Sequence, residues 1–343
     1  MPDLPYRLIL QIVLHNIYKT EMNFENSLNN KKAFYMYTYE SEGADFIAKA
    51  YAPGHITGFF QIHEHNDPHR KGSTGCGIVL NGGVTTEVKA GKSVEKTEIF
   101  LNGKKVEGRT TRTVVEMLTD VPVKVKSWAE IPVGCGFGAS GAGALGAAYA
   151  LNRVLSLNQT VKSLTEYAHV AEVVNRSGLG DIAAQSNGGV VIRLHPGGPE
   201  FGRIDRIPAP EARVFGIALG EISTDSILTD EVTAGKINAA GKVAMSELLK
   251  KPTLENFMHQ AKDFASNTGL MSSTAKDVIE AAHANGGLAS QAMLGDTVFA
   301  IAPYAQEFPL FEALQEFGQV ALQEFGQVLE YGISTCVPRL LYD

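Results

Sequence analysis

The chain has 343 residues, of which 44% are hydrophobic and 20% charged, so it has the composition of a globular protein and the length of two domains. The formal net charge of −7 argues against binding to nucleic acid or to a membrane surface, and no apolar stretch is long enough to span a bilayer. Three widely spaced cysteines form no metal-binding pattern, which predicts a reducing, cytoplasmic location.

The first recognisable strand begins well inside the chain. Residues 1–44 have no clear periodicity, and we expect them to be a loosely ordered N-terminal extension. The alternation of Phe46–Ala52 predicts the first strand, which runs into Ala-Pro-Gly and then His55.

A long polar loop is predicted after this strand, with the densest group of ionisable residues in the chain. Its histidines and glutamate suggest a zinc site, but their spacing fits no common one: His63, Glu64, His65 and His69. Arg70 and Lys71 are better suited to binding a carboxylate or a phosphate. A solvated loop without a ligand is the alternative.

The next elements lead to a glycine-rich segment. We predict strands at Gly77–Leu80, Gly83–Lys89 and Val121–Ile131, a hairpin around Asn102-Gly103, and a helix at Thr110–Leu118.

The segment Pro132–Ala148 reads PVGCGFGASGAGALGAA and joins the last of these strands to a helix at Gly138–Leu155. Glycine at this density permits positive φ and lets a ligand approach the main chain closely. The helix N-terminus then offers free N–H groups to a phosphate, and the Ser140 hydroxyl suits a phosphate-bound Mg²⁺. Close packing of a helix on a sheet is the other explanation of such a segment. No Gly-Lys-Ser/Thr follows, and the glycine spacing does not fit a dinucleotide fingerprint.

This segment resembles the second motif of the GHMP kinases, P-x-x-x-G-[LF]-G-x-S-x-A. The residues that match in register are Pro132, Gly136, Phe137, Gly138, Ser140 and Ala142. The resemblance implies that ATP phosphates bind along Pro132, Gly134, Gly136, Phe137, Gly138, Ala139, Ser140 and Gly141.

A second segment, AEVVNRSGLGDIAAQSNGG, also follows the order of these kinases. The resemblance implies that Glu172 on the helix Leu164–Asn175 binds Mg²⁺ together with Ser140, and that Asp181 accepts the proton of the substrate hydroxyl or orients it. Taken alone, the glutamate is more often solvated, and the aspartate more often caps a turn or a helix. The Gly-Gly pair after them leads into a strand at Val190–Leu194.

The family resemblance also predicts the fold, an α+β protein with an N-terminal domain like domain 2 of ribosomal protein S5 and an α+β C-terminal domain. Because Pro196–Pro210 is rich in glycine and proline, we place the ATP-binding domain at 45–200 and the C-terminal domain at 201–343. At the end of the first strand, His55 replaces the basic residue usual in the family and is a candidate catalytic residue.

The C-terminal half is predicted to hold one strand, three helices and a strand pair: Val214–Leu219, Asp230–Leu249, Leu254–Ser266, Thr274–Ala284, Gly287–Met293 and Thr297–Ala302. In GHMP kinases a glycine-rich third motif lies between the last two strands, and only Gly295 of it remains here. The octapeptide ALQEFGQV at Ala313–Val320 is repeated at Ala321–Val328, and only one copy can keep a buried helical register.

Four segments together resemble one branch of the family, the archaeal pantoate kinases. They are APGHITGFFQIHEH, GCGFGASGAGALG, AEVVNRSGLGDIAAQ and SQAMLGDTVFA. That resemblance implies transfer of phosphate from ATP, with Mg²⁺, to the 4-hydroxyl of pantoate in coenzyme A biosynthesis. Arg70, Lys71 or Arg176 would bind the substrate carboxylate, and Asp181 would face its hydroxyl. The alternatives are a homoserine, mevalonate or shikimate type of kinase, or a nucleotide-binding sensor without catalysis. A small molecule and ATP are the expected partners, with a homodimer as a further expectation.

Overall fold

The structure, a computed structural model, describes residues 45–220, 230–293, 295–321 and 327–342. Its larger sheet has eight strands, six of them in the order β12-β1-β2-β5-β3-β4. Strand β6 pairs with the first part of β2, whereas β5 pairs with the last part, and β7 pairs with β6. These strands are β1 (Phe46–His63), β2 (Gly72–Ala90), β3 (Glu98–Leu101), β4 (Lys104–Val106), β5 (Val123–Ala129), β6 (Val190–His195), β7 (Arg203–Ile207) and β12 (Arg339–Leu341).

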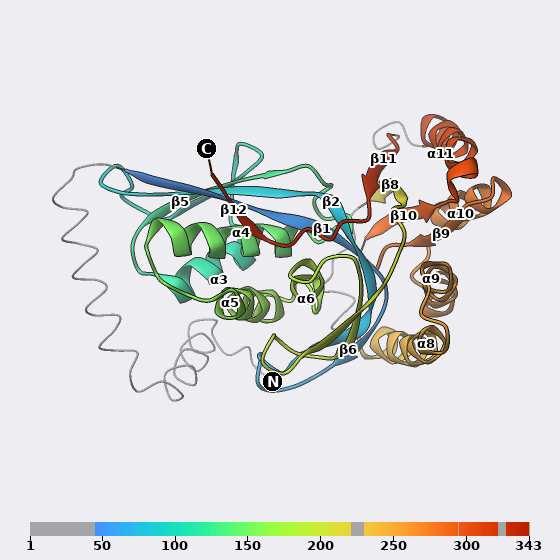
Figure 1. Cartoon of the computed structure of the whole chain (residues 1–343), viewed down its shortest axis with the longest axis horizontal. Helices are drawn as coiled ribbons and strands as arrows, with labels where there is room; N and C mark the ends of the chain where they lie inside the picture. Colours follow the sequence, from blue (N-terminus) through green and yellow to red (C-terminus); the bar gives the residue numbers. More distant parts are fainter. Residues whose placement is uncertain (1–44, 221–229, 294, 322–326, 343) are drawn as a thin grey trace.

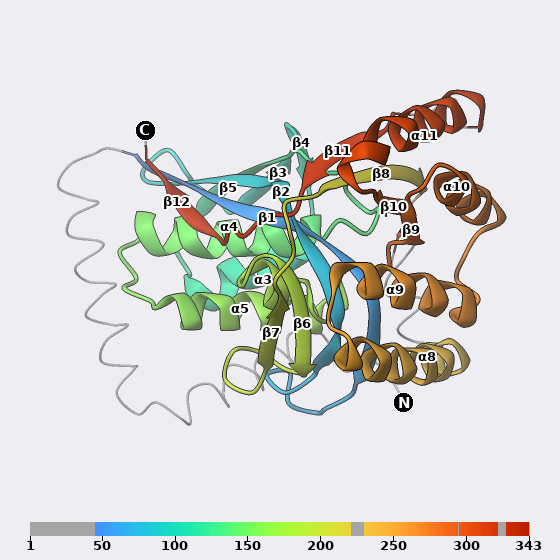
Figure 2. The same ribbon diagram turned by 45° about the vertical axis from the view of Figure 1, so that its right-hand side comes forward.

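Helices cover one face of this sheet, as Figures 1 and 2 show. They are α3 (Arg109–Leu118), α4 (Ala139–Val154), α5 (Val161–Val174) and the short α6 (Asp181–Gln185). The central helix α4 packs on β1 and β2, and it is buried almost all round because it consists mainly of glycine and alanine. At Gly146 an added Cβ would lie 2.7 Å from the Thr86 hydroxyl, so the small residues allow helix and sheet to approach closely.

The C-terminal half forms a four-stranded sheet in the order β11-β8-β10-β9, flanked by helices (Figure 2). Its elements are β8 (Arg213–Gly220), α8 (Glu231–Lys250), α9 (Leu254–Thr268), α10 (Ser273–Ala284), β9 (Leu288–Gln291), β10 (Asp296–Ile301), α11 (Glu307–Ala321) and β11 (Leu329–Gly332). Helices α8 and α9 pack on the second half of β1, where the Phe59 ring lies 6.2 Å from that of Phe257. The second half of β1 therefore connects the eight-stranded sheet, to which it belongs, with helices of the C-terminal half.

The α+β prediction is confirmed, and most predicted helices and strands lie within a few residues of their observed bounds. The first strand is longer than predicted, because β1 continues to His63 and the polar loop begins only at Glu64. Register shifts between Pro53 and His55 and between Thr57 and Phe59 absorb the proline and glycine residues that suggested a turn.

One further strand prediction was wrong, and one strand was missed. The two strands expected at Gly77–Leu80 and Gly83–Lys89 are one strand, β2, whose glycines accommodate neighbours instead of a turn. An added Cβ at Gly83 would lie 2.2 Å from the Ala52 carbonyl oxygen. The strand β7, which was not predicted, lies inside the segment Pro196–Pro210 used to place the domain boundary, and it pairs with β6.

The repeated octapeptide is described only in part. Its first copy belongs to α11, where Leu314 is buried, whereas residues 322–326 of the second copy lie outside the described residues. The extension 1–44 lies outside them as well, and the domain division at 200/201 stays a prediction. Among the helices that the structure describes, none is long and apolar enough to cross a bilayer.

Candidate active site

The glycine segment forms a loop between β5 and α4. Gly134, Gly136 and Gly138 have φ values of 80°, 83° and 67°, a left-handed conformation that glycine adopts without strain. Protein donors bind the loop's carbonyl oxygens, since the His55 N–H donates to Phe137 at 3.0 Å and Gln185 Nε2 donates to Gly138 at 2.8 Å. The loop is thereby held from behind, and α4 begins at its end with the unsatisfied N–H groups of a helix N-terminus.

The C-terminal half supports the same loop. The Thr297 hydroxyl donates to the Cys135 carbonyl at 2.8 Å, and Gly295 lies directly against this backbone. The single glycine left of the expected third motif therefore contacts the phosphate-loop candidate itself.

Gly295→Ala should disturb the loop without touching its sequence. The new Cβ would lie 2.2 Å from the Cys135 carbonyl carbon and oxygen, which are backbone atoms that cannot rotate away. Such overpacking costs about 1–3 kcal/mol, so we expect a lower melting temperature and a KM for ATP raised by about tenfold or more. Gly235→Ala on α8 is the control, since no atom lies within 4 Å of its added Cβ and neither Gly235 nor Gly295 has positive φ. Equal KM values for ATP in the two variants would contradict the contact.

The glycine loop borders a cleft of about 360 Å³. One end is lined by the β3–β4 hairpin and the start of α3, and the other by β1, β6 and Met293. Of the predicted phosphate-binding residues, those that line the cleft are Gly134, Gly136, Phe137, Gly138, Ala139 and Ser140, whereas Pro132 and Gly141 do not. The Ser140 hydroxyl donates to Thr110 Oγ1 at 3.0 Å, which joins the starts of α4 and α3.

Two carboxylates meet beside this loop. A Cβ added to Gly178 would lie 2.7 Å from Glu172 Oε1 and 3.2 Å from Asp181 Oδ2, so the glycine leaves the space that both acids share. Glu172 is 1% exposed, and neither of its oxygens has a hydrogen-bond partner. Burial, together with the neighbouring Asp181, raises the pKa of Glu172 well above its ordinary value; the charge of Arg193 opposes this only partly.

Asp181 itself lines the cleft, and its side chain is 22% exposed. Its Oδ1 lies 2.7 Å from Nδ1 of His55, a residue that is completely buried behind it. Burial lowers the pKa of His55 more than Asp181 raises it, so the imidazole is neutral and its Nδ1–H donates to the carboxylate. His55 does not line the cleft, and its ring reaches the cleft only through the contact with Asp181.

An arginine that the motifs did not indicate completes the cleft. Arg193 on β6 is 2% exposed, lines the cleft, and has two guanidinium nitrogens, Nε and Nη1, buried without a partner. Asp181 and Glu172 lie close enough to raise its pKa, although burial lowers it more. An arginine inside the apolar strand VVIRL was the available sequence signal, because a buried cation needs a partner.

The basic residues predicted to bind substrate lie elsewhere. Lys71 Nζ pairs with Glu64 at 2.6 Å, and Arg70 lies 3.7 Å from Asp67 with its guanidinium over the Phe201 ring. Neither residue lines the cleft, and neither does Arg176, which is exposed just after α5.

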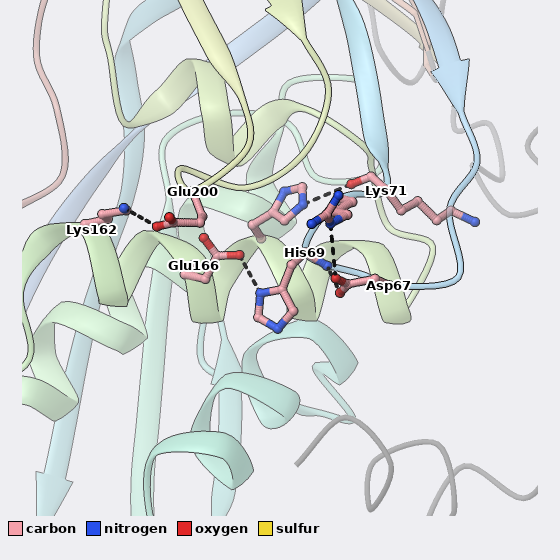
Figure 3. A network of polar contacts seen from close by, with 8 residues as sticks. Asp67, His69, Lys71, Lys162, Glu166 and Glu200 are labelled. Atoms are coloured by element: carbon pink, nitrogen blue, oxygen red, sulfur yellow. Dashed lines mark hydrogen bonds and ion pairs between the residues drawn. The ribbon is translucent and has the colours of Figure 1, made fainter. Parts of the chain in front are cut away.

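The loop that carries them is attached to α5 by other residues (Figure 3). His69 Nδ1 lies 2.6 Å from Glu166 Oε1, and His169 Nε2 donates to the Lys71 carbonyl at 3.0 Å. The ionisable cluster of the sequence is thus largely a structural clamp, and within the described residues no group of three or more His, Cys, Asp or Glu could hold a metal ion.

Family models match both halves of the chain. Residues 90–189 match the GHMP kinases N terminal domain, and residues 245–320 match the GHMP kinases C terminal model. A pantoate kinase from Methanocaldococcus jannaschii is 38% identical over 258 residues, which cover 73% of this chain and 91% of that protein. A pantoate kinase from Thermococcus kodakarensis is 34% identical over 265 residues, 74% of this chain and 87% of that one.

The chain belongs to the GHMP kinase family. A solved structure described as a phosphotransferase related to the CoA biosynthesis pathway is 31% identical to this GHMP kinase. It superposes with a TM-score of 0.75 and covers 86% of this chain and 98% of the other. The family assignment predicted from the glycine loop is confirmed.

Proposed function

We propose that this GHMP kinase transfers the γ-phosphate of ATP to the 4-hydroxyl of pantoate. One observation carries the proposal: Asp181 and Arg193, whose Nε and Nη1 are buried without a partner, line the same cleft as the glycine loop. A hydroxy acid needs a carboxylate for its hydroxyl and a cation for its carboxylate, and this cleft offers both beside a phosphate site. The pantoate kinases among its relatives support the choice of acceptor.

The nucleotide would bind along the hairpin end of the cleft. Its phosphates would lie over the glycine loop and the first turn of α4, whose N–H groups and dipole favour negative charge. The base would lie against the apolar side chains of the β3–β4 hairpin and its neighbours, Ile99, Phe100, Leu101 and Val106.

Ser140 and Glu172 are the residues that would hold Mg²⁺. Both Glu172 oxygens are buried without a partner, and oxygen donors of this kind, with one carboxylate and substrate phosphates, are those that Mg²⁺ prefers. When bound, the ion would neutralise charge on the β- and γ-phosphates. Ser140 lines the cleft and Glu172 lies next to Asp181 without lining it, so together they offer a hydroxyl and a carboxylate that fit the group.

Asp181 would act on the acceptor. Its carboxylate would accept the proton of the 4-hydroxyl or hold that hydroxyl in line with the γ-phosphate. The neutral His55 would orient Asp181 from behind through its Nδ1–H, so it is a positioning residue and does not touch the substrate. Arg193 would bind the carboxylate through its planar guanidinium, the part first predicted for Arg70, Lys71 or Arg176.

Glu172→Gln should separate stability from activity. Because burial raises the pKa of Glu172 above its ordinary 4.5, the folded protein without Mg²⁺ binds more protons than the unfolded chain over the range between the two values. Its free energy of unfolding therefore falls as the pH rises through that range, and glutamine removes this fall.

At neutral pH we expect the melting temperature of this variant to rise by about 2–4 °C for each kcal/mol recovered, while kcat falls by about 10²-fold or more. Thermal scans with and without Mg²⁺, together with the kinetic assay, measure both effects. A variant that melts at a lower temperature than the wild type at neutral pH would show that Glu172 is ionised and well paired.

The proposed reaction is tested with the full-length protein, ATP, Mg²⁺ and pantoate in a coupled ADP-release assay, with the phosphorylated product identified by mass spectrometry. Turnover of pantoate is the expected result. Turnover of homoserine, mevalonate or shikimate in its place would assign another acceptor, and ATP binding without turnover of any would indicate a sensor. Size-exclusion chromatography of the same preparation measures the predicted homodimer.

A further inference from the structure

The acceptor end of the cleft has an apolar wall, which we define as Thr57, Phe60 and Met293. The first two residues lie on β1, and Met293 follows β9 in the C-terminal half. The Met293 N–H donates to the Thr57 carbonyl at 2.9 Å, and the Phe60 ring packs 5.9 Å from Phe264. The wall is therefore fixed by main-chain and ring contacts, with Phe60 2% and Met293 3% exposed.

Strand register places this wall beside the guanidinium. Phe60 on β1 pairs with Gly75 on β2, and Gly75 pairs with Arg193 on β6, so the three residues form one row across the sheet. A Cβ added to Gly75 would lie 2.8 Å from the Phe60 Cα and 2.9 Å from Arg193 Nη2. The missing side chain lets the apolar wall and the charged group border the same small space.

Asp181 lines the same cleft, next to the glycine loop. A Cβ added to Gly138 in the loop would lie 3.4 Å from the Asp181 Cγ. An acceptor held by Arg193 at its carboxylate and by Asp181 at its hydroxyl must place its middle carbons between them. Those carbons then face Thr57, Phe60 and Met293.

We infer that the apolar wall selects an acceptor whose middle carbon is fully alkylated. Pantoate fits this requirement, since its carbon 3 carries two methyl groups between the carboxylate end and the 4-hydroxyl. The inference rests on the proposed function and adds to it the feature by which this site distinguishes pantoate from other short dihydroxy acids. An apolar pocket discriminates by about 10- to 200-fold for each methylene that it accommodates.

The test compares kcat/KM for pantoate with kcat/KM for 2,4-dihydroxybutanoate, which lacks only the two methyl groups. The wild-type protein should prefer pantoate by about tenfold or more. Met293→Gln, which places a polar amide at the wall, should reduce the preference to about threefold or less, mainly by losing activity on pantoate. Met293→Leu should keep the preference, because it conserves volume and polarity.

Thr57→Ser is a second variant that keeps the hydroxyl and removes one methyl group from the wall, so the preference should fall by a smaller factor. Met245→Gln is the matched control, since Met245 is partly buried on α8 and does not line the cleft; it should leave the ratio unchanged. The KM for ATP should stay constant throughout.

Equal wild-type kcat/KM values for the two acceptors, or an unchanged ratio in both Met293→Gln and Thr57→Ser, would overturn the inference while pantoate kinase activity stands. Absence of wild-type turnover with both acceptors would instead overturn the proposed function. The two failures are thus distinguishable in one set of measurements.

Discussion

Replacing Asp181 with asparagine should lower kcat with pantoate by about 10²- to 10⁴-fold, the range lost when a positioned general base is removed. The asparagine keeps the size of the side chain and can still accept a hydrogen bond from His55 at the position of Oδ1. It cannot take a proton from the acceptor hydroxyl. ATP binding, measured by calorimetry, should be retained because the glycine loop is intact.

The control for this variant is Asp67→Asn, which changes an acid outside the cleft that pairs with Arg70. It should keep wild-type kcat. If Asp181→Asn retained kcat within about threefold, the hydroxyl would need no base and the role assigned to Asp181 would be lost. If Asp181→Asn lost both kcat and ATP binding, the loss would come from a displaced glycine loop. A lower melting temperature of the variant would show this displacement.

Removal of the Arg193 charge should act on the acceptor and spare the nucleotide. Arg193→Met takes away the two guanidinium nitrogens that are buried without a partner, and a charged hydrogen-bonded pair of this kind is worth about 2–5 kcal/mol. We therefore expect the KM for pantoate to rise by about 30-fold or more, with the KM for ATP unchanged. Arg193→Lys should show an intermediate effect, because a lysine cannot bind a carboxylate through two parallel hydrogen bonds.

Arg70→Gln and Lys71→Gln are the matched comparisons, since these residues were the sequence-based candidates for the same part. Their acidic partners Asp67 and Glu64 already occupy them, so we expect little change in the KM for pantoate. The opposite pattern, with large effects at Arg70 or Lys71 and none at Arg193, would show that the pantoate carboxylate does not bind at Arg193. Melting temperatures of all four variants exclude unfolding as the cause.

Local backbone chemistry explains why the glycine loop was predictable. Gly134, Gly136 and Gly138 all have positive φ. Glycine adopts this conformation readily, so the residue type alone indicates the loop. Ser140 follows them within the first turn of α4, so its place in the site comes with the loop. Asp181, further along the chain, was predicted from motif order and does line the cleft.

Strands that contain proline and glycine were harder to predict, because such residues have two meanings. At Pro53-Gly54 they mark a bulged strand, and in β2 Gly82 and Gly83 make room for Tyr331 and Tyr51 on neighbouring strands. In a sequence both patterns resemble turns. Only the neighbour that approaches each glycine distinguishes the cases.

Charged residues in the polar loop were hard to interpret from the sequence for a similar reason. Arg70 and Lys71 were conspicuous because charged residues gather around them, and that is why they are not available: Glu64 and Asp67 lie within reach on the same loop. Arg193 was inconspicuous because its strand is apolar. A basic residue in an apolar stretch therefore indicates a binding site for an anion better than one with acidic neighbours in the sequence.

The sequence by itself determined the family, the glycine loop, and the order of the serine and the two acids, because each depends on short motifs and on the conformations open to single residues. Tertiary structure decided that Arg193 lines the cleft and that Phe60 lies in the same row of the sheet. That row crosses three strands, and Arg193 is more than 100 residues from both Gly75 and Phe60 in the sequence. Only strand register, which the whole core sets, places an arginine, a glycine and a phenylalanine at one point.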